Sequence, residues 1–188
     1  VGVAGAWWIV CAARDLSGLR RRGRLAAIVP IVSRTAVTAA VAYLAFLLLW
    51  GLNYRRPPLT DRVAFDPARV SQAAAVALVE QSVSQLNVLH APAHASGWPE
   101  QGEMDGALRD AFARTERALG SSWQAHPARP KKTLLDFYFR RAGVAGMTDP
   151  YFLETLVTTD LLPFERPAVI AHEWSHLAGI TDEGEANF

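Results

Sequence analysis

The longest apolar run in the chain, Ile31–Leu52, limits what its N-terminal part can fold into. As an α-helix, this run of 22 residues would extend for about 33 Å, enough to cross the hydrocarbon core of a bilayer. Arg34, near its start, can reach the headgroup region, and Trp50 and Tyr54 suit the opposite interface. A buried core helix is the alternative, but the uninterrupted apolar stretch 36–52 favours a membrane span.

A shorter apolar segment, about 1–13, precedes this run and is separated from it by a basic stretch, about 14–24, with five Arg and one Asp. We interpret the first segment as part of another span. A short Arg-rich loop is expected on the cytoplasmic side, which places the residues after the second span outside the cytoplasm. The prediction is a multi-pass protein of the cell membrane, with residues 1–54 as membrane anchor in contact with lipid and residues 55–188 as extracytoplasmic domain.

The two parts differ in charge. Residues 1–54 hold six Arg and one Asp, a net charge of +5, whereas residues 55–188 hold thirteen Lys and Arg against seventeen Asp and Glu, a net charge of −4. An acidic domain argues against nucleic acid as its partner. The single cysteine, Cys11, allows no disulfide bond within the chain.

The segment His172-Glu173-Trp174-Ser175-His176 contains the pattern His-Glu-x-x-His. On an α-helix, His172 and His176 lie one turn apart on the same face, where their imidazoles can share one Zn²⁺. Glu173 can take a proton from a zinc-activated water and is therefore the predicted catalytic residue. An ordinary amphipathic helix that carries two histidines is the structural alternative.

The residues around this pattern favour a helix with a sharp end. Pro163 and Pro167 suit a helix start. Gly179 can end the helix in a left-handed conformation and turn the chain back toward the histidines. A third ligand beyond this turn would complete a catalytic zinc site, and the candidates are the three carboxylates Asp182, Glu183 and Glu185.

The rest of the domain is predicted to be mainly α-helical with a small β element. One helix is expected over about 66–89, opened by an Asp-Pro pair, and another over 103–119. Residues 134–139 fit either a strand or a helix, and residues 151–159 fit a strand. The edge of that strand could pair with an extended peptide beside the metal, or the strand could lie inside a small sheet.

A second pair of histidines, His90 and His94, has the same spacing of four. Pro92 lies between them and is expected to break the helical geometry, and no Glu adjoins them. Metal binding is therefore not predicted at this pair.

Three further segments form distinctive motifs. One is Trp-Gly-Leu-Asn-Tyr-Arg-Arg-Pro-Pro-Leu at 50–59, directly after the span. The others are Thr-Thr-Asp-Leu-Leu-Pro-Phe-Glu-Arg-Pro at 158–167, which leads into the histidine motif at 172–179, and the closing segment 183–188. These motifs resemble those of a bacterial membrane family known as domain of unknown function 3810. This family is similar to gluzincin-type zinc metallopeptidases. The resemblance implies a zincin-like α+β domain after N-terminal transmembrane helices, in a natural protein that continues past Phe188.

The third ligand can be assigned in two ways. Asp182 has metzincin spacing from the histidines, with Asp where those enzymes usually have His. Glu183-x-x-Ala-Asn instead resembles an element of several gluzincin families in which the first Glu binds zinc. A helical Glu183 would also place Asn187 on the same face, able to orient a ligand histidine. We predict Glu183 as the third ligand, keep Asp182 as the alternative, and expect Glu185 to lie on another face.

Together these features predict a membrane-anchored zinc metallopeptidase that hydrolyses peptide bonds of a peptide or protein outside the cytoplasm. The alternative is a non-catalytic, zinc-stabilised scaffold or binding domain at the membrane. Glu173 favours the enzyme, because a structural zinc site has no need of a carboxylate beside its first histidine and usually closes with Cys or His.

Overall fold

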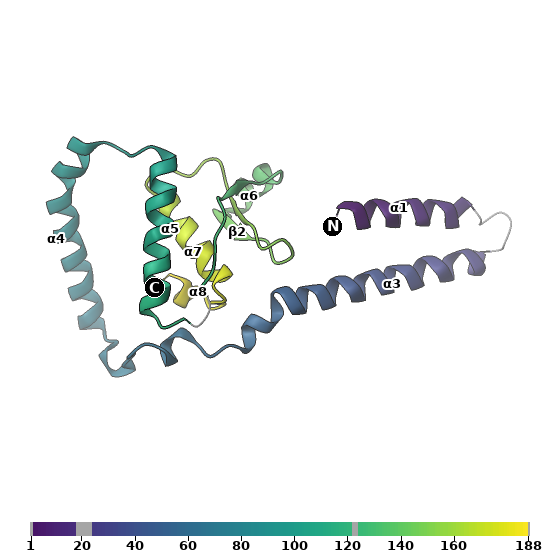
Figure 1. The fold of residues 1–188 in the computed structure, drawn as a ribbon, viewed down its shortest axis with the longest axis horizontal. Coiled ribbons are helices and arrows are strands. Elements are labelled where there is room, and N and C mark those ends of the chain that lie inside the picture. The colour runs from purple at the N-terminus through teal and green to yellow at the C-terminus, as the bar shows by residue number, and fades with distance from the viewer. Residues whose placement is uncertain (1, 18–23, 122–123, 188) are drawn as a thin grey trace. The chain divides into compact units, whose positions relative to one another are not determined.

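The structure, a computed structural model, describes residues 2–17, 24–121 and 124–187. The chain divides into two compact units between Leu52 and Asn53 (Figure 1).

The first unit contains two long helices, α1 (Gly2–Ser17) and α3 (Arg24–Leu49), which contact each other. Trp8 Nε1 donates a hydrogen bond of 3.3 Å to Thr35 Oγ1 across this contact. The basic stretch predicted over 14–24 begins inside α1, and its residues 18–23 lie outside the described part of the chain.

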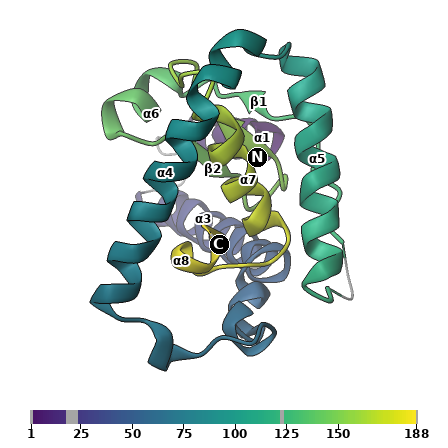
Figure 2. The same cartoon turned by 90° about the vertical axis from the view of Figure 1, so that its left-hand side faces the viewer.

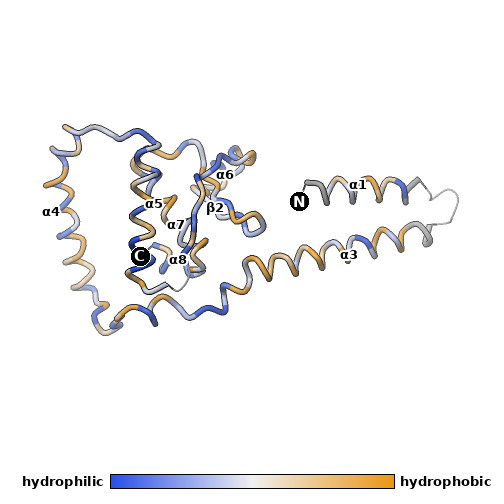
Figure 3. The backbone as a smooth tube through the Cα atoms, in the orientation of Figure 1, coloured by the Kyte–Doolittle hydropathy of each residue, from blue (hydrophilic) through white to orange (hydrophobic). Residues whose placement is uncertain are grey.

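Helix α3 contains the apolar run. Its segment Ile28–Leu49, 22 residues long, is sufficiently apolar to cross a membrane, and it starts three residues earlier than predicted. Figure 3 shows α3 as a largely hydrophobic tube. Pro30 lies inside this helix. Among the described residues, α3 is the one helix that is long and apolar enough to cross a membrane. Such a helix suits a membrane anchor or a signal sequence.

The second unit begins with three short 3₁₀ turns, η1 (Gly51–Arg55), η2 (Leu59–Asp61) and η3 (Pro67–Arg69). The predicted helix start at residue 66 was wrong, because Asp66 caps η3 instead, accepting a hydrogen bond of 3.0 Å from Ala68 N. The long helix α4 (Gln72–Ser96) begins later, where Ser71 accepts a hydrogen bond from Ala74 N.

Helix α4 also ends later than predicted, because it continues through Pro92. Ser96 Oγ donates to the carbonyl oxygens of Pro92 and Ala93 at 3.0 and 3.2 Å and so stabilises the last turn. The expectation of a break at Pro92 was therefore wrong, and the rings of His90 and His94 lie 4.5 Å apart on this helix. No further His, Cys, Asp or Glu joins them as a possible third ligand in the part of the chain that the structure describes.

Helices α5 (Gln101–Ala118) and α7 (Arg166–Leu177) enclose the core together with a small sheet. Trp174 and Ile170 of α7 are completely buried. The ring of Phe112 on α5 meets the Trp174 ring edge-on, with centroids 5.7 Å apart. The helix predicted over 103–119 thus packs against the helix that carries the histidine motif.

The sheet has three strands, β1 (Lys131–Lys132), β2 (Gly146–Thr148) and β3 (Thr155–Val157), in the order β1-β3-β2. Strand β3 pairs in parallel with β1 and antiparallel with β2. Of the two alternatives for the strand over 151–159, the internal strand is confirmed and the peptide-binding edge was wrong, because β3 lies between β1 and β2. Strand β2 is an edge of the sheet. Between β1 and β2, the chain forms helix α6 (Asp136–Ala142). Of the segment 134–139, which fitted either a strand or a helix, residues 136–139 are therefore helical.

Strand β3 is shorter than predicted because a turn precedes it. Asp149 Oδ1 accepts hydrogen bonds from Tyr151 N and Phe152 N at 2.8 and 3.0 Å, and Leu153 takes a positive φ of 53°. These aromatic residues thus belong to the turn. The described domain is mainly α-helical with a small sheet, as predicted, and it closes with the four-residue helix α8 (Glu183–Ala186).

Candidate metal centre

Helix α7 positions His172 and His176 on one of its faces because its other face is held in the core. Ile170 and Trp174 are buried there, and Pro167 lies in the first turn, where a missing N–H is tolerated. The two imidazole rings meet edge to face with centroids 4.8 Å apart. Their side chains are 22% and 11% exposed, so one edge of the pair faces solvent.

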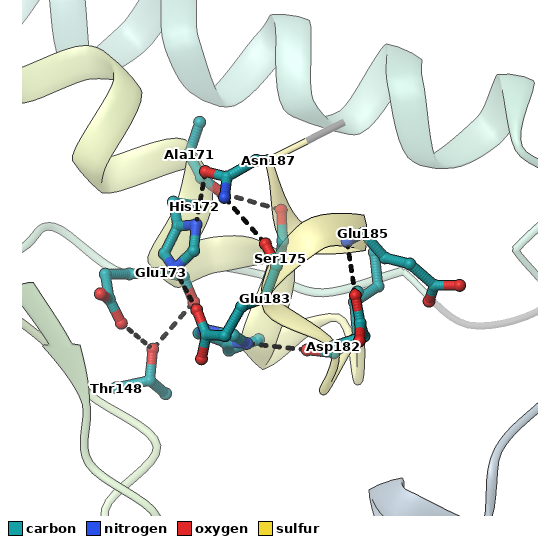
Figure 4. A network of polar contacts seen from close by, with 11 residues as sticks. Thr148, Ala171, His172, Glu173, Ser175, Asp182, Glu183, Glu185 and Asn187 are labelled. Carbon is teal, nitrogen blue, oxygen red and sulfur yellow. Dashed lines mark hydrogen bonds and ion pairs between the residues drawn. The ribbon is translucent and has the colours of Figure 1, made fainter. Parts of the chain in front are cut away.

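The chain turns back toward this pair directly after α7. Gly179 adopts a φ of +88°, the left-handed conformation predicted for the helix end. Helix α8 then presents Glu183, whose Oε2 lies 3.1 Å from His172 Nε2 and whose Oε1 lies 3.6 Å from His176 Nε2 (Figure 4). The potential ligand atoms of these three residues all lie within 4.8 Å of one another. They are the residues predicted as metal ligands from the sequence.

Both histidines form a hydrogen bond through Nδ1, on the side away from Glu183. His176 Nδ1 lies 2.8 Å from the carbonyl oxygen of Ile180, which can only accept, so this nitrogen carries the proton. His172 Nδ1 lies 3.0 Å from Asn187 Oδ1, while Asn187 Nδ2 donates to the Glu183 carbonyl at 2.8 Å (Figure 4). The amide thus presents its oxygen to His172, which is the contact predicted for Asn187.

The two other candidate carboxylates, Asp182 and Glu185, accept hydrogen bonds from backbone N–H groups. Asp182 is the N-cap of α8, and its Oδ1 accepts a hydrogen bond of 2.9 Å from Glu185 N. The Glu185 carboxylate accepts from Leu59 N and Thr60 N, at 2.9 and 3.3 Å. Of the three carboxylates after the turn, Glu183 is the one that reaches the histidines.

Glu173 is buried, with 6% of its surface exposed, at the point where α7 passes strand β2. Thr148 Oγ1 lies 2.9 Å from Glu173 Oε2 and 2.8 Å from the Glu173 carbonyl oxygen, and its single proton serves one of them at a time. Burial raises the pKa of the Glu173 carboxyl, and the hydrogen bond from Thr148 opposes this shift. Thr148 therefore fixes both the backbone and the carboxyl of Glu173.

Gly146 lies against the same carboxyl. A Cβ atom at this position would come within 3.0 Å of Glu173 Oε1 and 2.9 Å of Val169 Cγ1, so a glycine lets β2 approach α7 closely. Neither Gly146 nor Thr148 was identified as a functional residue from the sequence. No local pattern indicates them, since their contact with Glu173 depends on how β2 packs against a helix 25 residues further along.

The chain was compared with known proteins in three ways. A family model described as "Protein of unknown function (DUF3810)" matches residues 2–188. No curated protein and no solved structure matches the chain.

Proposed function

This chain belongs to the DUF3810 family of proteins of unknown function, and we propose that it is a membrane-anchored, zinc-dependent metallopeptidase with a zincin-like domain. The observation that carries the proposal is the convergence of His172, His176 and Glu183, with Glu173 buried beside the first histidine. Three protein ligands leave a position for water or substrate, which distinguishes catalytic from structural zinc sites.

The distances from Glu183 to the two histidines suit a shared zinc ion. Two ligands of a tetrahedral zinc at bond lengths of about 2.0–2.1 Å lie about 3.4 Å apart. The distances of 3.1 and 3.6 Å from Glu183 to His172 and His176 lie on either side of this value.

The tautomers of the histidines support the same proposal. In a neutral imidazole with Nδ1 as donor, Nε2 holds the lone pair that a metal requires. The hydrogen bonds from His176 to Ile180 and from His172 to Asn187 direct both Nε2 atoms toward Glu183. Outward hydrogen bonds of this kind orient metal-ligating histidines in proteins.

The chemistry of the chain's own residues centres on Glu173. When bound, zinc polarises a carbonyl oxygen and lowers the pKa of water. The Glu173 carboxylate takes the proton of the water that attacks the scissile carbonyl carbon. It then delivers this proton to the leaving amine nitrogen as the C–N bond breaks. The hydrogen bond from Thr148 Oγ1 to the Glu173 carboxylate orients the base for both transfers.

A peptide substrate has a candidate binding edge in β2 rather than in β3. Among the described residues β2 pairs with β3 alone, so its other edge can accept an extended peptide, and Thr148 on this strand contacts Glu173. An unfolded segment of a protein outside the cytoplasm therefore suits the proposed active site.

The proposed reaction is tested with the purified full chain in detergent and a mixture of peptides, analysed by mass spectrometry. Cleavage is expected with zinc, should stop on chelation, and should return when Zn²⁺ is added back. A chain that holds zinc and cleaves none of the peptides would favour the scaffold function instead.

The location of the domain outside the cytoplasm is part of the proposal and can be tested by thiol labelling. In a chain with Cys11→Ser, an impermeant thiol reagent added to intact cells is expected to label Ser84→Cys on α4, whose surface is exposed, but not Gly18→Cys in the basic stretch. Permeabilised cells provide the control, since both positions should then react. The reverse pattern in intact cells would place the domain in the cytoplasm.

Thr148 provides a graded test of how Glu173 is positioned. Thr148→Val keeps the shape of the side chain but removes the hydroxyl, and is expected to lower kcat by about 10²-fold because a misplaced catalytic group costs about this much. Zinc content should stay unchanged. Thr148→Ser, which keeps the hydroxyl, is the matched control and should stay near the wild-type rate. An unchanged kcat in Thr148→Val would exclude the positioning role.

A further inference from the structure

The segment directly after the apolar helix contacts the loop that carries Glu183. Arg56 Nη1 donates a hydrogen bond of 2.9 Å to the carbonyl oxygen of Ala178, at the end of α7. Leu59 N and Thr60 N donate to the two carboxylate oxygens of Glu185 at 2.9 and 3.3 Å. These contacts join parts of the chain that are 122 to 126 residues apart in the sequence.

Arg56 holds the start of the loop. Ala178 is the C-cap of α7, where helix carbonyls lack partners and a cation is favourable. The guanidinium also covers Gly179, since a Cβ atom there would lie 2.1 Å from Arg56 Nη1. The turn that sends the chain back toward the histidines favours a glycine because of its φ of +88°, and a side chain at this position would displace the Arg56 guanidinium.

Glu185 holds the far end of the loop. Its carboxylate accepts both hydrogen bonds from η2, and the neighbouring Leu59 is buried, with 3% exposed. Figure 4 shows the side chains of Glu183 and Glu185 leaving α8 in different directions. One carboxylate thus meets the histidines while the other meets the segment at 59–60.

Glu183 depends on these contacts for its position. Its side chain is 75% exposed, so packing does not hold it. Helix α8 has four residues, too few to be stable in isolation. The place of the Glu183 carboxylate therefore follows from the backbone of the loop. Arg56 and Glu185 hold this loop at its two ends, and the hydrogen bonds of Ile180 and Asn187 with the histidines add to that hold.

We propose that Arg56 and Glu185 are positioning residues for the third zinc ligand, so that segment 56–60 is a working part of the metal centre and more than a linker. The proposal rests on the proposed zinc site. It gives a role to the Arg-Arg-Pro-Pro-Leu motif that follows the span, which the peptidase chemistry alone does not use.

The test measures Zn²⁺ affinity of the full chain in detergent by competition with a chromophoric chelator. Arg56→Ala and Glu185→Gln are each expected to raise the Kd for Zn²⁺ by about 10- to 100-fold, the usual effect of losing a residue that orients a metal ligand. In Glu185→Gln the amide is isosteric but retains one acceptor for two N–H donors. Arg56→Lys keeps a cationic donor and should recover most of the affinity.

The neighbouring Arg55→Ala is the matched control, because Arg55 is exposed in the same segment, and its Kd should equal that of the wild type. Unchanged zinc affinity in both Arg56→Ala and Glu185→Gln would overturn the proposal. Should Arg56→Ala fail to fold, the Kd for Zn²⁺ of the isosteric Glu185→Gln variant alone tests the proposal.

Amide hydrogen exchange tests the positioning role independently of the proposed zinc site. In the metal-free chain, both variants are expected to speed amide exchange in residues 178–187 while leaving the buried part of α7 near Ile170 unchanged. If the wild-type chain binds no zinc, the peptidase proposal fails, and exchange alone decides whether segment 56–60 holds the loop. Wild-type exchange rates in both variants would then overturn the positioning role.

Discussion

Replacing His172 with alanine is expected to abolish stoichiometric zinc binding. The wild-type chain should hold about one Zn²⁺, and a site left with His176 and Glu183 has two ligands, too few for a catalytic zinc centre. The residue lies at the surface of α7, on the face away from Ile170 and Trp174, so the fold should survive the substitution. Metal analysis of the purified protein, together with its circular dichroism spectrum, measures both expectations.

Two matched substitutions in the loop after Gly179 test which residue is the third ligand. Glu183→Ala should lower zinc affinity by orders of magnitude, whereas Asp182→Asn should lower it little, because asparagine still caps α8. A large loss in Asp182→Asn with full binding in Glu183→Ala would move the third ligand to Asp182. Stoichiometric zinc in His172→Ala would rule out the proposed site altogether.

The convergence of the three candidate ligands could be predicted from the sequence because each step is local. The spacing of His172 and His176 needs only a helix, and Gly179 supplies the turn after it. Glu183 follows within a few residues, so its approach to the histidines needs no knowledge of the wider fold. The contact of Asn187 with His172 could be predicted for the same reason, since it requires one further helical turn.

The residues that support this centre could not be predicted, because they come from distant parts of the chain. Thr148 contacts Glu173 because β2, an edge strand of the sheet, packs beside α7. The order of strands in a sheet cannot be read from the sequences of the strands. In the sequence Arg56 was one residue of the motif at 50–59, and its contact with Ala178 depends on the packing of the whole domain.

Two local predictions failed for other reasons. Residues 151 and 152 have strand-forming side chains, but Asp149 draws their backbone into a turn. Pro92 lacks an N–H, yet α4 continues for another turn in which Ser96 bonds back to the Pro92 carbonyl. In both cases a side chain that bonds to nearby backbone outweighs the intrinsic preference of the residue.

The conservative substitution Glu173→Gln is expected to leave zinc in place while removing turnover by several orders of magnitude. Glutamine has the shape of the buried glutamate and can still accept the hydrogen bond from Thr148, so the packing of β2 against α7 is retained. Its amide cannot take a proton from water, and the proposed reaction then lacks its base. A loss confined to kcat, with normal zinc content and little change in KM, would indicate an interaction made in the transition state.

Because a trace of a contaminating peptidase can imitate weak activity, Glu173→Gln and wild type must be purified in parallel and compared on one peptide with one cleavage site. Glu103→Gln, at an exposed position in the first turn of α5, is the matched control and should keep the wild-type rate. Undiminished cleavage by Glu173→Gln would mean that another group is the base or that the activity belongs to another protein. The loss should be far larger than in Thr148→Val, where the Glu173 carboxylate remains but no longer accepts the hydrogen bond that orients it.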